Sequence, residues 1–294
     1  MFRNESLIME KIDLSKFIGK DVSEVISLAD KFYEKDLEGK INAHYIYNSL
    51  LDVVPNTHLY PNTKIRGTVR QKIWDIEKFF NWNQIYFSQS GQDKCLKNYF
   101  FRNFRNGFFV EIGAYDGVIG SNCYFFEKNM NWKGIAIEPS PIYFGKLKNN
   151  RNCKCYNKAI SNITGVKEFI EVQAGCTQMG GLNSEEYKNT LKIFKKDSRT
   201  KINKIHVETS TFQEIVKENK FIDYLSIDVE GEEMRIIESI NFNYFEIKVL
   251  SIENNYPKEK SFYNFLKEKG FIYFDNFGVD EIYYNKKYFN NKSF

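Results

Sequence analysis

The sequence lacks any apolar run near the roughly 20 residues that a membrane-spanning helix requires. Its N-terminus, MFRNESLIMEKIDLSK, also lacks the unbroken apolar stretch of a secretory signal. These two absences predict a cytoplasmic protein with no membrane span.

Cysteine is scarce, with five residues in the chain. Their number is odd, none shows the spacing of zinc ligands, and the pair in Cys153-Lys-Cys155 is closer than in a CxxC site. We therefore expect reduced structural thiols at all five positions, which are Cys95, Cys123, Cys153, Cys155 and Cys176.

The chain also has little excess charge, since 42 basic and 38 acidic residues give a formal net charge of +4. The basic residues are spread among the acids and form no RNA-binding signature. Nucleic acid is not an expected partner. The hydrophobic fraction of 42% is enough for a real core, and the length suits one large α/β domain with an accessory segment.

Residues 1–85 are predicted to form a mainly helical appendage. Apolar residues recur at helical spacing over residues 21–33, and a second apolar series from Tyr45 stops at Pro55. The apolar faces of these helices leave three roles open: packing on the main domain, contact within a homo-oligomer, or framing of an acceptor site.

Residues 86–294 show a different pattern, in which short apolar strands alternate with helices. This rhythm predicts a doubly wound, mostly parallel sheet. Strands are expected at 108–112, 134–137, 155–159, 166–172, 225–227 and 249–252, and helices at 142–149, 233–239 and 262–269. The segments 272–274 and 281–284 are expected to form an antiparallel hairpin around Gly278.

A glycine-rich turn, Gly113-Ala-Tyr-Asp-Gly117-Val-Ile-Gly120, follows the first predicted strand. Ligands of open α/β sheets bind at the carboxyl ends of strands, so the turn predicts a nucleotide-like ligand. Its glycine spacing differs from the G-x-G-x-x-G fingerprint of dinucleotide sites. Glu111 at the strand end is suited to the ammonium of a methionine moiety, and the amides near Gly113 are suited to its carboxylate. These features favour S-adenosylmethionine (SAM) over NAD.

Glu138 ends the second predicted strand, 22 residues after Asp116. A carboxylate at this position is expected to accept hydrogen bonds from both ribose hydroxyls of the cofactor. The alternative is an acidic N-cap of the helix that follows Pro139. After the third predicted strand, Ser161 is a candidate for the adenine edge or belongs to an ordinary turn.

The fourth predicted strand leads into Asp228-Val-Glu230-Gly231-Glu232-Glu233. A hydroxyl that receives a methyl group must lose its proton as the new bond forms. Asp228 is the candidate base, with Glu230 or His206 as alternates. Asp228 and Glu230 would also suit Mg²⁺, but no further carboxylate is identifiable as a ligand, so no metal is predicted.

Two other segments are candidates for acceptor binding. The stretch from Glu253 to Tyr256 follows the fifth strand and offers amide and phenol groups to a sugar. Residues 173–204 carry a basic run that suits either a lid over phosphates or a solvated helix face. The run comprises Lys192, Lys195, Lys196, Arg199, Lys201 and Lys204.

Taken together, five stretches resemble the FkbM family of SAM-dependent methyltransferases, over about residues 86–285. They are SQSGQD at 88–93, FVEIGAYDG at 109–117, SNCYFFE at 121–127, GIAIEPSP at 134–141 and SIDVEG at 226–231. The resemblance implies a Rossmann-like, seven-stranded sheet with one reversed strand, and methyl transfer to hydroxyls that are often on sugars or natural-product glycosides.

The resemblance also places residues at the site. It implies that Asp228 lies near the transferred methyl, that Glu111, Gly113 and Glu138 contact SAM, and that Gln89, Gln92 and Asp93 close the methionine end. Independently of the resemblance, Asp116 and Gly117 of the glycine-rich turn and Ser161 are also expected to contact the cofactor. The predicted function is SAM-dependent O-methylation of a sugar hydroxyl, on a nucleotide-activated sugar or glycoside used for surface polysaccharide. The alternatives are an NAD-type oxidoreductase and a non-catalytic SAM-binding module.

Overall fold

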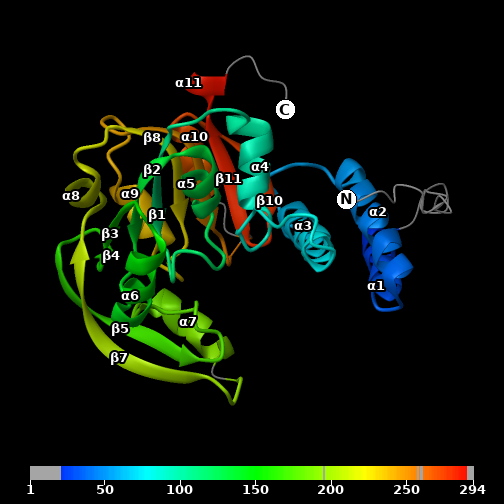
Figure 1. The fold of residues 1–294 in the computed structure, drawn as a ribbon, viewed down its shortest axis with the longest axis horizontal. Helices are drawn as coiled ribbons and strands as arrows, with labels where there is room; N and C mark the ends of the chain where they lie inside the picture. The colour runs from blue at the N-terminus through cyan, green and yellow to red at the C-terminus, as the bar shows by residue number, and fades with distance from the viewer. Residues whose placement is uncertain (1–20, 195, 257, 259–260, 290–294) are drawn as a thin grey trace.

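Two β-sheets and an N-terminal group of helices make up the molecule (Figure 1). The computed structural model describes residues 21–194, 196–256, 258 and 261–289. None of the helices in these ranges is long and apolar enough to cross a bilayer.

The larger sheet has seven strands in the order β10-β11-β9-β8-β1-β2-β3. Strand β11 runs antiparallel to both of its neighbours, and the other pairings are parallel. The strands are β1 (Phe108–Ile112), β2 (Lys133–Ile137), β3 (Lys154–Tyr156), β8 (Phe221–Ile227), β9 (Glu246–Glu253), β10 (Phe271–Phe277) and β11 (Asp280–Asn285). This topology confirms the predicted mostly parallel sheet with one reversed strand, and the hairpin around Gly278.

Helices cover both faces of this sheet, which is why its central strands are buried along most of their length rather than at alternate residues. One face packs against α8 (Phe212–Val216), α9 (Glu233–Ser239) and α10 (Ser261–Glu268). The other packs against α4 (Gln92–Leu96), the π-helical turn η2 (Lys97–Phe101), α5 (Tyr124–Met130) and α11 (Lys286–Phe289). Helix α6 (Pro141–Asn150) packs through Leu147 against Ala114 and Ala136.

A second, four-stranded sheet lies beside the carboxyl ends of the first, in the order β4-β7-β5-β6 (Figure 1). It consists of β4 (Ala159–Ile160), β5 (Gly165–Ala174), β6 (Gly181–Leu182) and β7 (Lys201–Ser210), with α7 (Glu185–Phe194) between β6 and β7. The strand expected at 166–172 is present as part of β5. The strand expected at 155–159 is instead divided, because the chain passes from β3 in the first sheet to β4 in the second.

Three helices precede the sheets: α1 (Val22–Tyr33), α2 (Leu37–Val53) and α3 (Asn62–Phe79). Asp21 and Asp36 cap the first two, since their side chains accept hydrogen bonds from the amides of Ser23 and Gly39. The three helices share an apolar core that includes Ala29, Ala43, Ile46, Val69 and Ile76. Helix α1 confirms the helix expected at 21–33.

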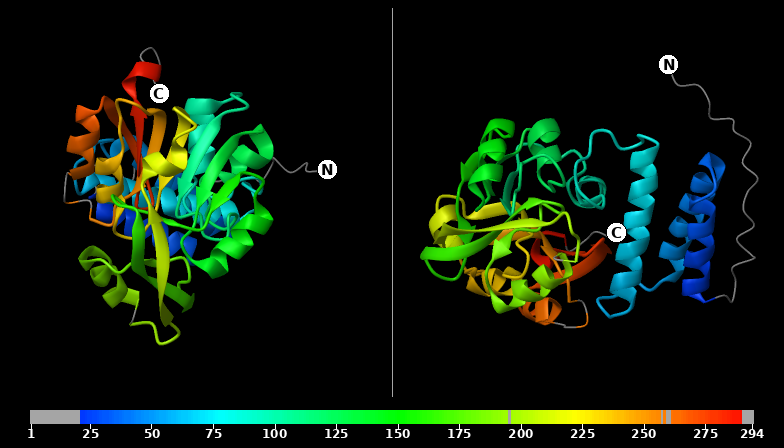
Figure 2. Two further views of the ribbon diagram at one scale, coloured as in Figure 1. Left: turned by 90° about the vertical axis from the view of Figure 1, so that its left-hand side faces the viewer. Right: turned by 90° about the horizontal axis from the view of Figure 1, so that it is seen from below.

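Helix α3 is docked on the edge strand β10 (Figure 2). The Arg66 guanidinium donates to both carboxylate oxygens of Asp275, with Nε–Oδ1 at 2.6 Å and Nη2–Oδ2 at 2.8 Å, and both side chains are buried. Arg70 Nε donates to the same carboxylate at 2.9 Å. A Cβ atom on Gly67 would lie 2.0 Å from the carbonyl oxygen of Gly278, so this close approach requires glycine.

The substitution Arg66→Ala is expected to lower the free energy of unfolding by about 3 kcal/mol. It removes the two hydrogen bonds from Arg66 to the buried Asp275 carboxylate and leaves that carboxylate paired with Arg70 alone. Urea titration monitored by circular dichroism measures the change. The matched control is Lys287→Ala, which removes an exposed ion pair with Glu246 and should cost less than about 1 kcal/mol. Equal losses in the two variants would contradict a stabilising role for the α3 junction.

Candidate functional site

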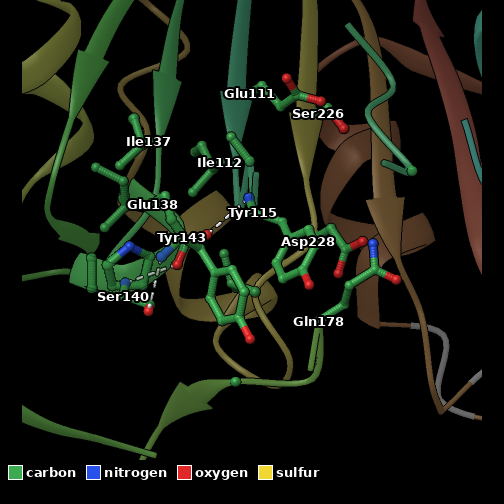
Figure 3. Close-up of a pocket in the computed structure, with 18 of the residues that line it drawn as sticks. Glu111, Ile112, Tyr115, Ile137, Glu138, Ser140, Tyr143, Gln178, Ser226 and Asp228 are labelled. Atoms are coloured by element: carbon green, nitrogen blue, oxygen red, sulfur yellow. Dashed lines mark hydrogen bonds between the residues drawn. The ribbon is translucent and has the colours of Figure 1, made fainter. Parts of the chain in front are cut away.

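A cavity opens at the carboxyl ends of β1, β2 and β8 (Figure 3). The sheet register brings Ile137, Ile112, Ile227 and Ile252 level with one another on four adjacent strands. The residues that follow them, Glu138, Gly113, Asp228 and Glu253, therefore lie along one edge. The second sheet closes the cavity from the opposite side with Ile160, Phe169, Glu171 and Val172.

Gly113 makes the turn after β1 possible. Its φ of +86° lies in the left-handed region, and a Cβ atom there would be 1.7 Å from the carbonyl oxygen of Asp228. The amide of Asp228 in turn donates to the Ile112 carbonyl at 3.0 Å. The ends of β1 and β8 are thus pressed together, and this contact fixes the position of Asp228 relative to the turn.

Glu138 directly follows the neighbouring strand β2 and binds the backbone of the turn after β1. It is 6% exposed, and its two carboxylate oxygens accept hydrogen bonds from the amides of Tyr115 (2.9 Å) and Ser140 (2.8 Å). Burial, with a smaller contribution from Glu171, raises the pKa of Glu138 to about 8. The N-cap of α6 is Ser140, so Glu138 is not the helix cap considered as the alternative.

Glu111 lines the same cavity, and its carboxylate forms hydrogen bonds and an ion pair with other residues of the protein. One oxygen accepts from the Ser121 hydroxyl (2.7 Å) and the Asn122 amide (3.0 Å), and the other is 2.8 Å from Arg151 Nη1. Both partners of this ion pair are buried. These hydrogen bonds position the start of α5 and the end of α6, and the contact of Glu111 with a ligand ammonium stays a prediction.

Of the other predicted cofactor residues, one lines the first cavity, and the contacts found for the rest are within the protein. Gln89 lines the cavity, whereas Gly117 permits close packing of α6, since a Cβ atom there would be 2.7 Å from a Leu147 methyl group. Asp93 and Asp116 accept backbone amides of their own loops. Two further side chains bond within the protein and do not line this cavity: Gln92 donates to Asp280 at 2.9 Å, and Ser161 accepts from Lys167 at 2.7 Å.

His206 does not belong to the site. It is an exposed residue of β7, paired in the second sheet with Glu168, and it lines neither this cavity nor the one beside it. Residues 201–210 form the strand β7, whose side chains alternate between the two faces of the sheet. His206 is on the face exposed to solvent.

A second cavity of about 1000 Å³ adjoins the first. It lies between the carboxyl edge of the sheet and α3, which contributes Lys64, Thr68, Gln71, Lys72 and Asp75 to its wall. The two cavities share five residues at their junction: Gln89, Gly120, Asn122, Gln178 and Asp228. Of the three roles left open for the N-terminal helices, the structure thus shows both packing on the main domain and framing of this cavity.

Acidic side chains converge where the cavities meet. One carboxylate oxygen each from Asp228, Glu230 and Glu253 lies within 4.8 Å of the others. Burial and the neighbouring Asp228 raise the pKa of Glu230 to about 9, and burial also raises that of Asp228. Sequence reasoning did not group Glu253 with the other two acids. Its position directly after the strand predicted at 249–252 was the available signal, and only the pairing of β9 with β8 places it beside Asp228.

The segment after β5 closes the first cavity. The Thr177 hydroxyl lies 2.7 Å from the Tyr115 hydroxyl, and Gln178 Nε2 donates to the Ile119 carbonyl at 3.2 Å. Figure 3 shows Gln178 beside Asp228 at the mouth of the cavity. The enclosed space is about 70 Å³, below the several hundred cubic ångströms of typical ligand sites. With Thr177 and Gln178 in these positions, the first cavity is smaller than a nucleoside requires.

The basic run in residues 192–204 lines neither cavity. Arg199 pairs with Asp197 at 2.6 Å and Lys204 with Glu168 at 3.0 Å, and both basic side chains are exposed. Lys195 lies outside the described residues. For the described members of the run, the solvated-face alternative agrees with the structure.

The order of the seven strands, the single reversed strand and the acid at the end of β2 beside a glycine turn define the Rossmann-like methyltransferase fold. Residues 111–273 match the model of the methyltransferase FkbM domain, and the chain belongs to this family of methyltransferases. The oxidoreductase alternative is thereby set aside.

Several solved structures match the chain at low sequence identity and low TM-score. They include methyltransferase FkbM from Methylobacillus flagellatus KT (10% identity, TM-score 0.41, covering 86% of this chain and 60% of that one). A fibrillarin/Nop5p complex (15%, 0.35, 66% and 78%) and the N-terminal domain of human METTL16 in complex with SAH (10%, 0.33, 94% and 98%) also match. The chain spans 60% of the length of the bacterial FkbM structure. No curated protein matches the chain in sequence.

Proposed function

We propose that the protein transfers the methyl group of SAM to a hydroxyl of a sugar, presented on a nucleotide-activated sugar or glycoside for surface polysaccharide. The observation that carries the proposal is the position of Glu138: a buried carboxylate held by two amides beside the glycine turn, at the entrance to a cavity that continues to Asp228. This is the arrangement expected for a ribose with two free hydroxyls.

The cavity supports one orientation of the donor. With the ribose on Glu138, the apolar wall made by Ile160, Phe169 and Val172 faces the adenine. The methionine end then extends past Gly113 towards Gln89. This orientation directs the sulfonium to the junction of the two cavities, where Asp228 lies.

Asp228 supplies the base in this proposal. Methyl transfer requires the acceptor oxygen, the methyl carbon and the sulfur in line, with the hydroxyl proton leaving as the bond forms. Burial and nearby acids raise the pKa of Asp228, which strengthens it as a proton acceptor while it remains ionised. Its position at the shared wall places it between donor and acceptor.

The second cavity has the lining expected for a sugar linked to a phosphate. Asn254, Asn255 and Tyr256 offer hydrogen bonds to hydroxyls, and Lys64 and Lys258 supply positive charge. A volume of about 1000 Å³ accommodates a nucleotide sugar.

Mass spectrometry tests the acceptor class. A panel of nucleotide sugars and simple glycosides is incubated with the protein and SAM that carries a deuterated methyl group. Gain of one labelled methyl by a sugar supports the proposal, and fragmentation identifies the oxygen. Binding of SAM and SAH without label transfer to any hydroxyl compound would favour the non-catalytic SAM-binding module instead.

The substitution Thr177→Val is expected to speed association of SAH several-fold, because it removes the hydrogen bond between residue 177 and Tyr115 that closes the first cavity. Stopped-flow fluorescence measures the association rate. Thr164→Val is the matched control, since Thr164 is an exposed residue that bonds Glu214 and lines neither cavity. An unchanged rate in Thr177→Val would show that this contact does not limit entry.

A further inference from the structure

Asp228, Glu230 and Glu253 form a compact group of oxygen atoms at the junction of the two cavities. We propose that these three carboxylates bind a divalent cation, Mg²⁺ or Mn²⁺. Cation binding by these carboxylates does not depend on the proposed function.

Backbone geometry brings the three acids together. Strands β8 and β9 are adjacent and parallel, with Ile227 paired to Ile252, so Asp228 and Glu253 follow side by side. Glu230 has a φ of +61°, a conformation that a non-glycine residue adopts at an energetic cost and that turns the chain back after Asp228. The 4.8 Å spread of the oxygens matches ligands that each lie 2.0–2.6 Å from one central ion.

The second observation is a lack of partners for buried oxygens. Oε2 of Glu230 and Oε2 of Glu253 accept no hydrogen bond, although the side chains are only 4% and 6% exposed. In the described part of the chain, no lysine or arginine forms an ion pair with any of the three acids. Buried carboxylates without compensation are costly, and a hard cation satisfies them directly.

A neighbouring amide extends the donor set. Oδ1 of Asn122 is also buried and unpartnered, and Asn122 lines both cavities beside Asp228. Carboxylates and amide oxygens are the ligands that Mg²⁺ and Mn²⁺ prefer. The absence of histidine and cysteine from the group disfavours zinc.

The position of the site suggests its role, and this step rests on the proposed function. All three carboxylates line the second cavity, so open coordination positions of the ion would face the acceptor. A cation held there by one oxygen of each acid would lower the pKa of the acceptor hydroxyl, and the other carboxylate oxygen of Asp228 would take up the proton. An acceptor with two neighbouring oxygens would bind most strongly.

The test uses the full chain and Mn²⁺, whose electron paramagnetic resonance signal falls on binding. We expect one Mn²⁺ per chain, displaced by excess Mg²⁺, and at least tenfold weaker binding in Glu253→Gln and in Glu230→Gln. The control Asp75→Asn removes an exposed acid from the wall of the same second cavity and should keep the wild-type affinity.

Absence of stoichiometric Mn²⁺ binding by the folded wild-type protein would overturn the site and indicate that the acids share protons instead. Equal Mn²⁺ binding by the wild type and both glutamine variants would also overturn it. Calorimetry of SAH binding without metal is run in parallel, because it tests the donor site alone. Circular dichroism shows whether each variant is folded. If one glutamine variant is not folded, the Mn²⁺ affinity of the other variant tests the site.

Discussion

Replacement of Glu138 by alanine is expected to weaken SAH binding by about two orders of magnitude. The carboxylate is placed to accept two ribose hydroxyls, and each hydrogen bond to a charged group is worth about 1.5–3 kcal/mol. A loss of about 3 kcal/mol corresponds to slightly more than a hundredfold in affinity. Isothermal titration calorimetry measures the change.

The matched control is Glu208→Ala, which removes an exposed carboxylate of β7 outside both cavities. Its SAH affinity should equal that of the wild type. Glu138 also orders the turn through the amides of Tyr115 and Ser140, so Glu138→Gln is compared, because it preserves most of the volume. Wild-type affinity in both Glu138 variants would rule out the ribose assignment.

The pKa of Glu138 makes SAH binding dependent on pH. With a pKa of about 8, the free protein carries a largely protonated Glu138 at pH 7, whereas the two ribose hydroxyls require an acceptor on both oxygens. Binding therefore releases a proton, and affinity should rise by up to tenfold per pH unit below pH 8 and level off above it. Calorimetry in buffers of different ionisation enthalpy detects the released proton. Glu138→Gln should lose this pH dependence.

Conversion of Asp228 to asparagine is expected to lower the turnover number by a factor of about 100 to 10,000, the usual contribution of a general base. Asparagine has nearly the same volume and cannot accept the hydroxyl proton. The substitution leaves the main-chain contacts of residue 228 with Gly113 and Ile112 in place, so the fold and the SAH affinity should be nearly unchanged. Single-turnover kinetics with the labelled acceptor measures the rate of methyl transfer.

The control for Asp228 is His206→Ala. His206 is exposed on β7 and lines neither cavity, so its loss should not change turnover. Full activity in Asp228→Asn together with inactivity in His206→Ala would reverse this assignment. Glu253→Gln separates the two proposed roles of Asp228, because it removes a cation ligand and leaves the base.

Much of the large sheet is predictable from the sequence because its strands are buried on both faces. Such strands are short apolar runs bounded by turns, and β1 coincides with the predicted segment at 108–112. The second sheet gives no comparable signal. Its strand β7 is exposed along much of one face and carries lysines, so its composition resembles a charged loop or lid.

Residues at strand ends are the predictable part of the site. Asp228 and Glu138 each follow an apolar strand directly, and parallel strands present their carboxyl ends at one edge. The hydrogen-bond partners of these residues are not predictable in the same way. The sequence places Glu111 beside the turn, but only the packing of α6 brings Arg151 within 2.8 Å of its carboxylate.

By itself the sequence determined the parallel sheet, the position of the glycine turn and the family, because these depend on local periodicity and on short motifs in a fixed order. The tertiary structure alone decided which acids meet. Glu253 is 23 residues beyond Glu230 and joins it because β9 pairs with β8, and α3 reaches the site because Arg66 binds Asp275 on β10. Such long-range contacts depend on sheet order and helix docking, for which the sequence carries no local signal.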